Sequence, residues 1–383
     1  MNSSFSSILI IGVGLIGGSI AAALKATDFE GKAPTVRGID IDAAAIESAR
    51  TKGYIDEGAI AGVDEARITA LLSDETTDLI ILAVPVSAAE DWFKRIDAAG
   101  YSGAITDVAS TKGVLIEQAG RLLSDGARYI PGHPMAGSEV NGIEGARATL
   151  FQNAHWILCP DEFSDPGVFT KLHDFVTMLG ARSISLAREE HDETIAVVSH
   201  VPHMVASALV QLAGAHAKDK QEIFRLAAGG FKDTTRIAAG SPELWCGIAL
   251  DNRQALAKGL TEIKQIITDI EQSLEHCDAK GLARLLGEAA ELRSSIPATW
   301  VPDSSRLVEV RIPMANHAGV IAQVTSFAAK AACNIQSIDI DHINEATAIL
   351  ELILTDEGDK GRFMSMLIEG GFDVSFRPLG YGV

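Results

Sequence analysis

The chain has 383 residues, of which 47% are hydrophobic and 22% charged, a composition typical of a folded protein of two or three domains. Its 51 acidic and 32 basic residues give a net charge of −19, and it has no long Lys/Arg cluster, which argues against binding to nucleic acid or an anionic membrane. The four cysteines form no CxxC pair, so we expect neither a zinc site nor disulfides, and a cytoplasmic location.

The first predicted strand and the loop after it indicate a dinucleotide site. Residues 8–11 are apolar, a GxGxxG motif follows, and a helical pattern begins after it. In this motif the glycines allow a tight turn, a close approach of the pyrophosphate and close packing of helix on strand. The uncharged N-terminus also resembles an export signal, but the glycines and the lack of an early Lys or Arg argue against that interpretation. The cofactor-binding residues predicted here are Gly12, Gly14, Leu15, Ile16 and Gly17.

The second predicted strand, residues 35–39, is followed by Asp40, about 20 residues beyond the motif. A carboxylate at this place accepts hydrogen bonds from the ribose of NAD and repels the 2′-phosphate of NADP, so it predicts NAD as the cofactor. Further strands at 78–84 and 104–107 alternate with helices, which predicts a parallel, doubly wound sheet of the Rossmann type. The residues expected beside the cofactor at the end of the third strand are Ala83 and Val84.

Two residues beyond the sheet are candidates for chemistry. Ser110 follows the strand at 104–107, where a nicotinamide and a substrate would meet, although it is equally suited to cap the helix that begins near Lys112. His133 lies in a predicted loop that is rich in glycine and proline, the kind of segment that often holds catalytic groups. We therefore expect a functional role for His133 and leave both roles of Ser110 open.

The middle of the chain predicts long helices. Residues 189–217 form an apolar helical pattern that Pro202 is expected to kink. His200 and His203 share one face of it, but a metal site needs a third ligand and HExxH is absent, so we expect no metal. A second pattern predicts one helix over 242–277, long enough to pack against a partner subunit.

Five motifs in this order resemble the family of prephenate and arogenate dehydrogenases, over residues 5–295 of the chain. They are GVGLIGGS (12–19), DVASTK (107–112), GHPMAGSE (132–139), SHVPH (199–203) and GGFKDTTR (229–236). The resemblance implies NAD-dependent oxidative decarboxylation of prephenate to 4-hydroxyphenylpyruvate in tyrosine biosynthesis, with arogenate as the alternative substrate. It also implies that His133 is catalytic, that Arg236 binds a substrate carboxylate and that Ser110 contacts the substrate hydroxyl. The remaining substrate-binding residues that it implies are His203, Lys232 and Trp245.

An acidic chain that binds an anionic substrate needs local positive charge. We expect Arg236, Lys232 and a protonated His203 to supply it. Two other classes remain as alternatives: a β-hydroxyacid dehydrogenase or imine reductase, and a non-catalytic NAD-sensing regulator. The GHPMAG and SHVPH motifs argue against the first, and a regulator need not keep His133, Arg236 and Ser110 together.

The C-terminal segment has a different pattern from the rest of the chain. After a Pro- and Ser-rich linker, the predicted order is strand (307–312), helix (318–331), strand (335–341), strand (347–354), helix (358–370) and strand (372–376). This ferredoxin-like order resembles an ACT domain, with Asn316 and Gly319 in the loop that holds an effector in such domains. The resemblance implies feedback control by an aromatic amino acid, with tyrosine as the expected effector.

The predicted architecture has three domains, and the chain is expected to form a homodimer with a small-molecule substrate. An NAD-binding Rossmann domain takes residues 1–165, and an all-α domain for substrate binding and dimerisation takes residues 166–295. A linker at 296–306 then leads to an α+β domain at 307–383.

Overall fold

The chain divides into two compact units, residues 1–269 and 270–383, which are described separately. The structure is a computed structural model. The residues that it describes are 5–27, 33–138, 140–217, 222–295, 307–315, 317, 319–342 and 347–378.

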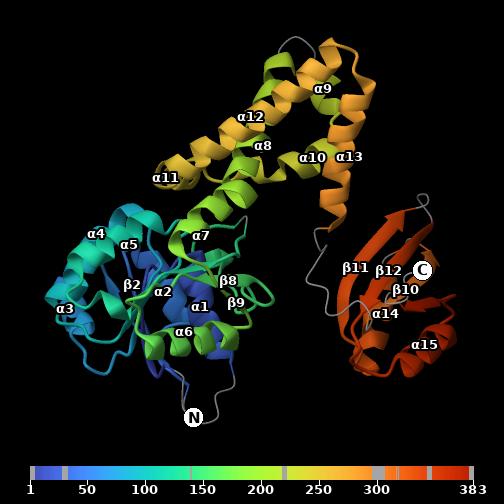
Figure 1. Ribbon diagram of the computed structural model, residues 1–383. Helices are drawn as coiled ribbons and strands as arrows, with labels where there is room; N and C mark the ends of the chain where they lie inside the picture. The colour runs from blue at the N-terminus through green and yellow to red at the C-terminus, as the bar shows by residue number, and fades with distance from the viewer. Residues whose placement is uncertain are drawn as a thin grey trace. The chain divides into compact units, whose positions relative to one another are not determined.

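A six-stranded parallel sheet forms the centre of the first unit (Figure 1). Its strand order, β3-β2-β1-β4-β5-β6, is that of a doubly wound Rossmann sheet, as the sequence predicted. The strands are β1 (Ser7–Ile11), β2 (Thr35–Asp40), β3 (Glu57–Ile60), β4 (Leu79–Leu82), β5 (Ala104–Asp107) and β6 (Tyr129–Ile130).

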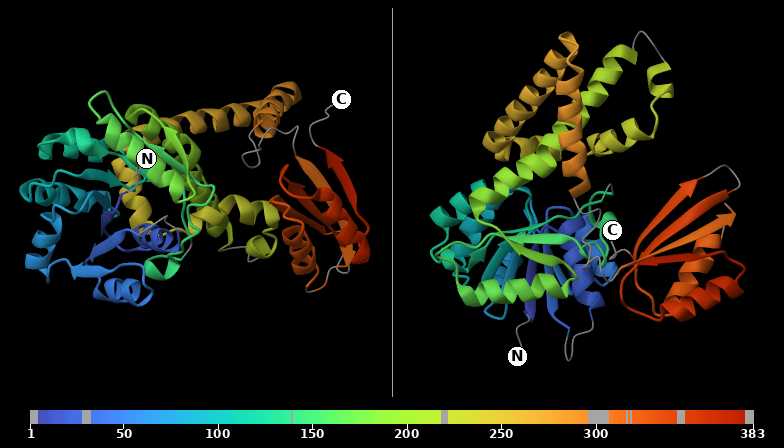
Figure 2. Two further views of the ribbon diagram at one scale, coloured as in Figure 1. Left: turned by 90° about the horizontal axis from the view of Figure 1, so that it is seen from below. Right: turned by 45° about the vertical axis from the view of Figure 1, so that its right-hand side comes forward.

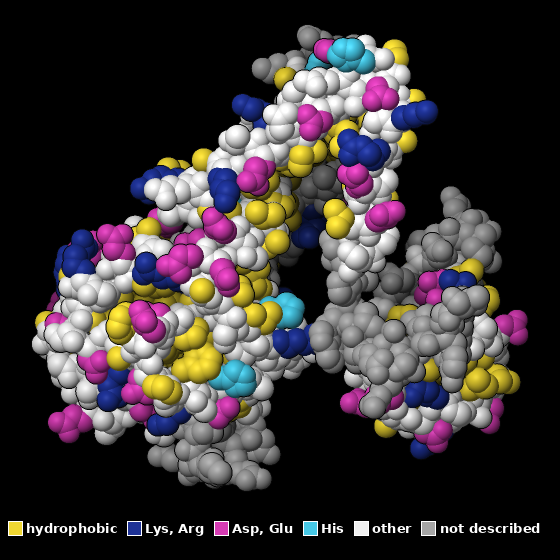
Figure 3. Space-filling view, in the orientation of Figure 1, with side chains coloured by type: hydrophobic (Ala, Val, Ile, Leu, Met, Phe, Trp, Pro, Cys, Tyr) yellow, Lys and Arg dark blue, Asp and Glu magenta, His cyan; other side chains and the backbone are white. Residues whose placement is uncertain are grey.

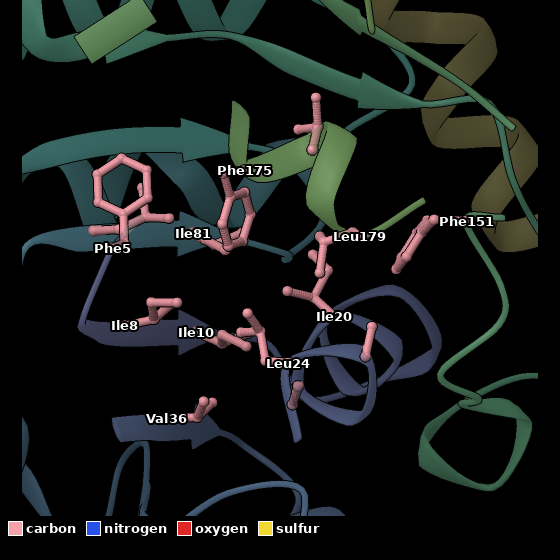
Figure 4. Packing of buried hydrophobic residues seen from close by; sticks show 14 of the residues in the cluster. Phe5, Ile8, Ile10, Ile20, Leu24, Val36, Ile81, Phe151, Phe175 and Leu179 are labelled. Carbon is pink, nitrogen blue, oxygen red and sulfur yellow. The ribbon is translucent and has the colours of Figure 1, made fainter. Parts of the chain in front are cut away.

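Helices cover both faces of this sheet, which explains why β1 is apolar throughout. Ile8 and Ile10 face one hydrophobic cluster, shown in Figure 4, and Leu9 and Ile11 face the other, because successive side chains of a strand point to opposite faces. The helices of the first face are α1 (Leu15–Ala26), α2 (Ala43–Thr51) and α6 (Pro166–Met178). Those of the second face are α3 (Glu65–Leu72), α4 (Val86–Ala98) and α5 (Gly113–Leu122).

A second sheet has three strands, and its first strand, β7, lies where the sequence predicted a loop. Its order is β7-β8-β9, and β7 places His133 opposite Ile157 of β8. The elements of this part are η1 (Gly126–Arg128), β7 (Gly132–Pro134), η2 (Ile143–Gly145), β8 (His155–Leu158) and β9 (Arg182–Ser185). The sequence prediction assigned α6 and β9 to the helical domain, but Phe175 of α6 packs on Phe5, with ring centroids 5.8 Å apart. The amphipathic face of α6 thus completes the core of the first sheet.

One continuous helical stretch, α7 (Arg188–Ile195), η3 (Ala196–His200) and α8 (Val201–Ala217), leads away from the sheets (Figures 1 and 2). Its irregularity is a π-helical turn at η3, closed by a hydrogen bond from the Val201 amide to the Ala196 carbonyl, immediately before Pro202. By length and composition this stretch is able to cross a membrane, and 33% of its most apolar window is buried inside the chain. It also carries three buried histidines, whose side chains contact other elements of the chain.

The remaining helices of the first unit are α9 (Glu222–Arg225), α10 (Gly229–Thr235), η4 (Arg236–Ala239), α11 (Pro242–Asp251) and most of α12 (Arg253–Glu275). The end of α12 and the helix α13 (Ala279–Ser295) belong to the second unit. The prediction of one helix over 242–277 is wrong, because the chain leaves the helical conformation at Asn252, with φ −105° and ψ 31°. The Asn252 side chain instead donates a hydrogen bond to the Asp192 carbonyl, 2.8 Å away. Figure 3 shows hydrophobic side chains exposed along these helices.

The described part of residues 307–378 forms a four-stranded sheet in the order β11-β12-β10-β13, in which each neighbouring pair is antiparallel. Its elements follow the predicted order and are β10 (Val308–Ala315), α14 (Val320–Lys330), β11 (Ile335–His342), β12 (Thr347–Leu354), α15 (Lys360–Glu369) and β13 (Ser375–Pro378). Gly319 caps α14 with φ +97°, in the left-handed region that favours glycine. The predicted linker and Asn316 lie outside the described residues.

Candidate active site

The glycine motif lies between β1 and α1, as predicted, and each of its glycines has a different environment. A Cβ on Gly12, which has φ +98°, would lie 2.2 Å from the Ala83 carbonyl oxygen. A Cβ on Gly17 would lie 2.0 Å from the Gly12 carbonyl oxygen, so these two glycines allow the close packing of strand, turn and helix. Gly14 has nothing within 4 Å of its Cβ position, and no side chain caps α1 there. The turn therefore leaves open space at a helix N-terminus, which fits a pyrophosphate.

The other predicted cofactor residues gather at this turn. Asp40 accepts a hydrogen bond from the Val13 amide at 2.6 Å, and Ala83 and Val84 both approach Gly12. The half-buried Leu15 and Ile16 form the first turn of α1. The carboxyl ends of β1, β2 and β4 thus meet at one edge of the sheet, where a dinucleotide binds in this fold.

His133 is buried and hydrogen-bonded rather than held in an open loop. Its side chain is 6% exposed, and its Nδ1 lies 2.9 Å from Nε2 of His191. His191 Nδ1 in turn lies 2.8 Å from Oδ1 of Asp192. Burial, with the positive charge of Lys112 adding to it, holds the pKa of His133 well below its usual value, so the imidazole is neutral at neutral pH.

Asp192 also joins this histidine pair to the loop that contains Ser110. Its two carboxylate oxygens accept hydrogen bonds from the amides of Lys112, at 2.9 Å, and Gly113, at 2.8 Å, where α5 begins. These bonds satisfy donors that a helix N-terminus leaves free. The alternative role of Ser110 as the cap of this helix is therefore wrong, and Ser110 remains half-buried in the loop between β5 and α5.

A buried ion pair lies beneath the same loop. Lys112 donates to Asp107 at the end of β5, and both side chains are at most 1% exposed. The second carboxylate oxygen of Asp107 accepts a hydrogen bond from the Tyr129 hydroxyl at 2.7 Å. The Asp107 carboxylate therefore has hydrogen-bond partners for both oxygens, which a buried ion pair needs. The Lys112 ammonium group is a fixed positive charge near His133.

A second group of rings lies between the helical stretch, which carries His200 and His203, and α11, which carries Trp245. His203 stacks on Trp245, with ring centroids 3.5 Å apart and an interplanar angle of 13°, and Trp245 makes an edge contact with His200. Burial lowers the pKa of His203, which opposes the protonated form that the sequence analysis expected. Its Nδ1 is buried and has no hydrogen-bond partner in the described part of the chain.

The predicted basic residues occur on neighbouring turns. Lys232 is exposed on α10, and Arg236 begins η4, which packs against α8, the helix of His203. The structure thus brings the turn of Arg236 to the helix that carries His203, one of the two stacked rings. In the described residues, no cluster of three or more His, Cys, Asp or Glu side chains could hold a metal ion.

The sequence reasoning missed His191, Asp192 and Asn252 as parts of this site. Asn252 donates to the Asp192 carbonyl and lies 3.2 Å from Nδ1 of His200, so it connects α7, η3 and the break before α12. His191 is 58 positions from its partner His133, and no local pattern indicates such a pairing. An adjacent His-Asp pair within the predicted helix at 189–217 was the available signal, but the same dipeptide at 173–174 is exposed.

A Rossmann sheet with an open glycine turn, next to a neutral buried imidazole, defines a nucleotide-dependent dehydrogenase. The models "Prephenate dehydrogenase, nucleotide-binding domain" and "Prephenate dehydrogenase, dimerization domain" match residues 20–185 and 187–288. The prephenate dehydrogenase of Bacillus subtilis is 33% identical over 371 residues, which cover 94% of this chain and 95% of that protein. The chain therefore belongs to the prephenate dehydrogenase family.

Two solved structures support the same assignment. Prephenate dehydrogenase from Aquifex aeolicus, in complex with hydroxyphenyl propionate and NAD+, is 29% identical with a TM-score of 0.70, covering 78% of this chain and 100% of that chain. Arogenate dehydrogenase from Synechocystis is 30% identical with a TM-score of 0.64, covering 76% of this chain and 100% of that one. The predicted family and nucleotide-binding domain are confirmed, and the predicted NAD-dependent dehydrogenase agrees with the Aquifex complex.

Proposed function

We propose that this chain uses NAD to oxidise and decarboxylate prephenate, forming 4-hydroxyphenylpyruvate for tyrosine biosynthesis. The observation that carries the proposal is His133, a neutral imidazole hydrogen-bonded beside the loop of Ser110 and close to the cofactor edge of the sheet. Such a group is suited to take the proton of a hydroxyl as it becomes a carbonyl. Ser110 is the proposed contact of that hydroxyl.

The remaining roles follow from charge and position. Arg236, supported by Lys232, binds a substrate carboxylate and orients the ring. His203 and Trp245 line the site, and the unpartnered Nδ1 of neutral His203 offers a hydrogen bond to the substrate. When bound at the glycine turn, with Asp40 at its ribose, NAD+ supplies the hydride acceptor. Loss of the ring carboxylate as CO₂ makes the ring aromatic, so the step is effectively irreversible.

Arogenate is the alternative substrate for the same site and the same reaction type. The two substrates differ in a side-chain keto or amino group, and relatives named for each are similarly distant from this chain. Initial rates of NADH formation with each substrate, and with NADP in place of NAD, test the proposal. Turnover with prephenate and NAD is expected, preference for arogenate would change the substrate, and no turnover with either would favour a non-catalytic NAD sensor.

We also propose that residues 307–383 form an ACT-like domain that binds tyrosine. Two observations support it: the strand-helix-strand-strand-helix-strand order with an antiparallel sheet, and the left-handed Gly319 at the start of α14. The measurement is the initial rate of the full chain with added Tyr, Phe or Trp, together with equilibrium dialysis. Inhibition by tyrosine alone is expected, and neither binding nor inhibition would leave the domain a structural role.

We further propose that the active form is a cytoplasmic homodimer assembled through the helices. The dimerization-domain model covers these helices, and an apolar groove of about 430 Å³ lies between α8, α10 and α12. Val197, Ile263 and Ile266 line this groove. The exposed free thiols of Cys246 and Cys277 agree with a reducing compartment.

A further inference from the structure

His133, His191 and Asp192, which we term the histidine series, form one continuous hydrogen-bonded line. The two contacts measure 2.9 Å between the imidazoles and 2.8 Å from His191 to the carboxylate. His191 is fully buried, and Asp192 is 17% exposed. The series joins β7 to α7, so it exists only in the folded chain.

The proton positions in this line follow from its carboxylate end. Burial opposes ionisation of Asp192, but the hydrogen bonds from His191 and from the amides of Lys112 and Gly113 outweigh it, and its pKa lies below the usual value. An ionised carboxylate only accepts, so when His191 carries a single ring proton, that proton is on Nδ1 and Nε2 is an acceptor. Nδ1 of His133 must then be the donor, which leaves the lone pair of His133 Nε2 free.

We propose that His191 and Asp192 are positioning residues that hold His133 in the tautomer whose Nε2 accepts the substrate proton. They also stabilise the imidazolium that forms, since its Nδ1–H points along a line that ends in a negative charge. The inference rests on the proposed function of His133 as the base. It adds two residues, neither of which touches the substrate, that decide which nitrogen reacts.

The other charged and titratable groups around His133 agree with this arrangement. Lys112, paired with Asp107, disfavours a second positive charge and therefore opposes protonation of His133. His200 is neutral, because burial lowers its pKa to about 4, and Tyr129 and Cys159 are neutral because burial raises theirs. Asp107 already pairs with Lys112, and Asp192 is the carboxylate at the end of the hydrogen-bonded line that starts at His133.

Asp192→Asn is the first test. The substitution removes the negative charge at the end of the line, and because both Asp192 oxygens accept backbone amides, no orientation of the Asn amide keeps every hydrogen bond. We therefore expect kcat to fall by about 10- to 1000-fold with little change in the substrate KM. The sign of the pH effect is also fixed. His133 acts as a base only in its neutral form. Loss of the Asp192 carboxylate disfavours the protonated imidazole and lowers the pKa of His133, so the acidic limb of the kcat/KM profile moves to lower pH.

His191→Phe separates this effect from helix capping, because Asp192 remains to cap α5. We expect a comparable loss of kcat, whereas His191→Gln, which keeps an acceptor near the Nε2 position, restores part of it.

Asp174→Asn is the matched control, since His173 and Asp174 repeat the same dipeptide in an exposed contact of 3.5 Å, and it should leave rate and pH profile unchanged. Unchanged kcat in both Asp192→Asn and His191→Phe would overturn the proposal, as would an unmoved acidic limb.

A measurement without turnover keeps the inference distinct from the proposed function. Nitrogen-15 chemical shifts of the histidine rings in the wild-type full chain report the tautomer directly, and His133 is expected to carry its proton on Nδ1. A proton on Nε2 would refute the inference even if the enzyme turns over prephenate. An inactive wild type with the expected tautomer would instead refute the proposed function and leave the tautomer assignment standing.

Discussion

At the scale of single residues, the proposed chemistry depends most on His133. In His133→Asn the substrate hydroxyl has no base to take its proton, while the carboxylate contacts remain. We expect kcat to fall by on the order of 10²–10⁴ with a modest change in KM. Steady-state kinetics with prephenate measure both constants, and an unchanged kcat would remove His133 from the mechanism.

Arg236 is expected to behave differently, because its proposed partner is the substrate and not the reacting proton. Arg236→Gln removes the charge that binds a carboxylate bidentately, so the substrate KM should rise strongly while NAD+ affinity stays nearly intact. Initial rates and a fluorescence titration with NAD+ give the two values. An equal loss of both affinities would contradict the assigned role.

The residue types at the site were predictable to different degrees. His133 lies in a segment whose Gly and Pro content and motif indicated function, and its role as a candidate followed from the sequence. Its neutral state was not predictable, because burial and the charge of Lys112 lower its pKa and both depend on packing. His203 shows the same limit: its motif indicated the residue, but burial against Trp245 decided its protonation state.

At the scale of elements, the glycine turn separates the requirements of folding from those of binding. The Cβ position of Gly14 is free of contacts within 4 Å, and its φ of −86° is not in the left-handed region. Gly14→Ala should therefore leave the thermal unfolding midpoint unchanged and weaken NAD+ binding by about tenfold or more, because the methyl group occupies the space of the pyrophosphate.

Gly17→Ala is the contrasting variant. Its Cβ would lie 2.0 Å from the Gly12 carbonyl oxygen and 2.9 Å from Ile10, so overpacking should destabilise the fold by about 1–3 kcal/mol. Thermal unfolding of both variants, with NAD+ titrations, distinguishes the two effects. Wild-type affinity for NAD+ in Gly14→Ala would place the pyrophosphate elsewhere.

Element boundaries were predicted where they follow from local chemistry. The strands of the first sheet and the elements after residue 307 follow from apolar periodicity, which a single segment carries by itself. The break at Asn252 and the π turn before Pro202 were not predicted. Both involve residues whose partners lie on other elements: Asn252 bonds Asp192, and the π turn carries His200.

At the scale of the whole molecule, the helices that the family model assigns to dimerization expose apolar side chains. Ile266 is 54% exposed and lines the groove between α8, α10 and α12. Ile266→Asp places a charge where a second copy is expected to pack, so it should convert the dimer to a monomer in sedimentation velocity. Val63→Asp, 72% exposed beside the parallel sheet, is the control and should remain a dimer. A wild-type monomer would contradict the proposed assembly.

By itself, the sequence determined the parallel sheet, the nucleotide turn, the family and most of the residues at the candidate site, because motifs and hydrophobic periodicity are local properties of the chain. Only the tertiary structure decided which groups meet: His191 with His133, Asp192 with the start of α5, and the ring of His203 with Trp245. The physical reason is that hydrogen bonding and burial set the protonation of these groups, and both arise between segments far apart in the sequence.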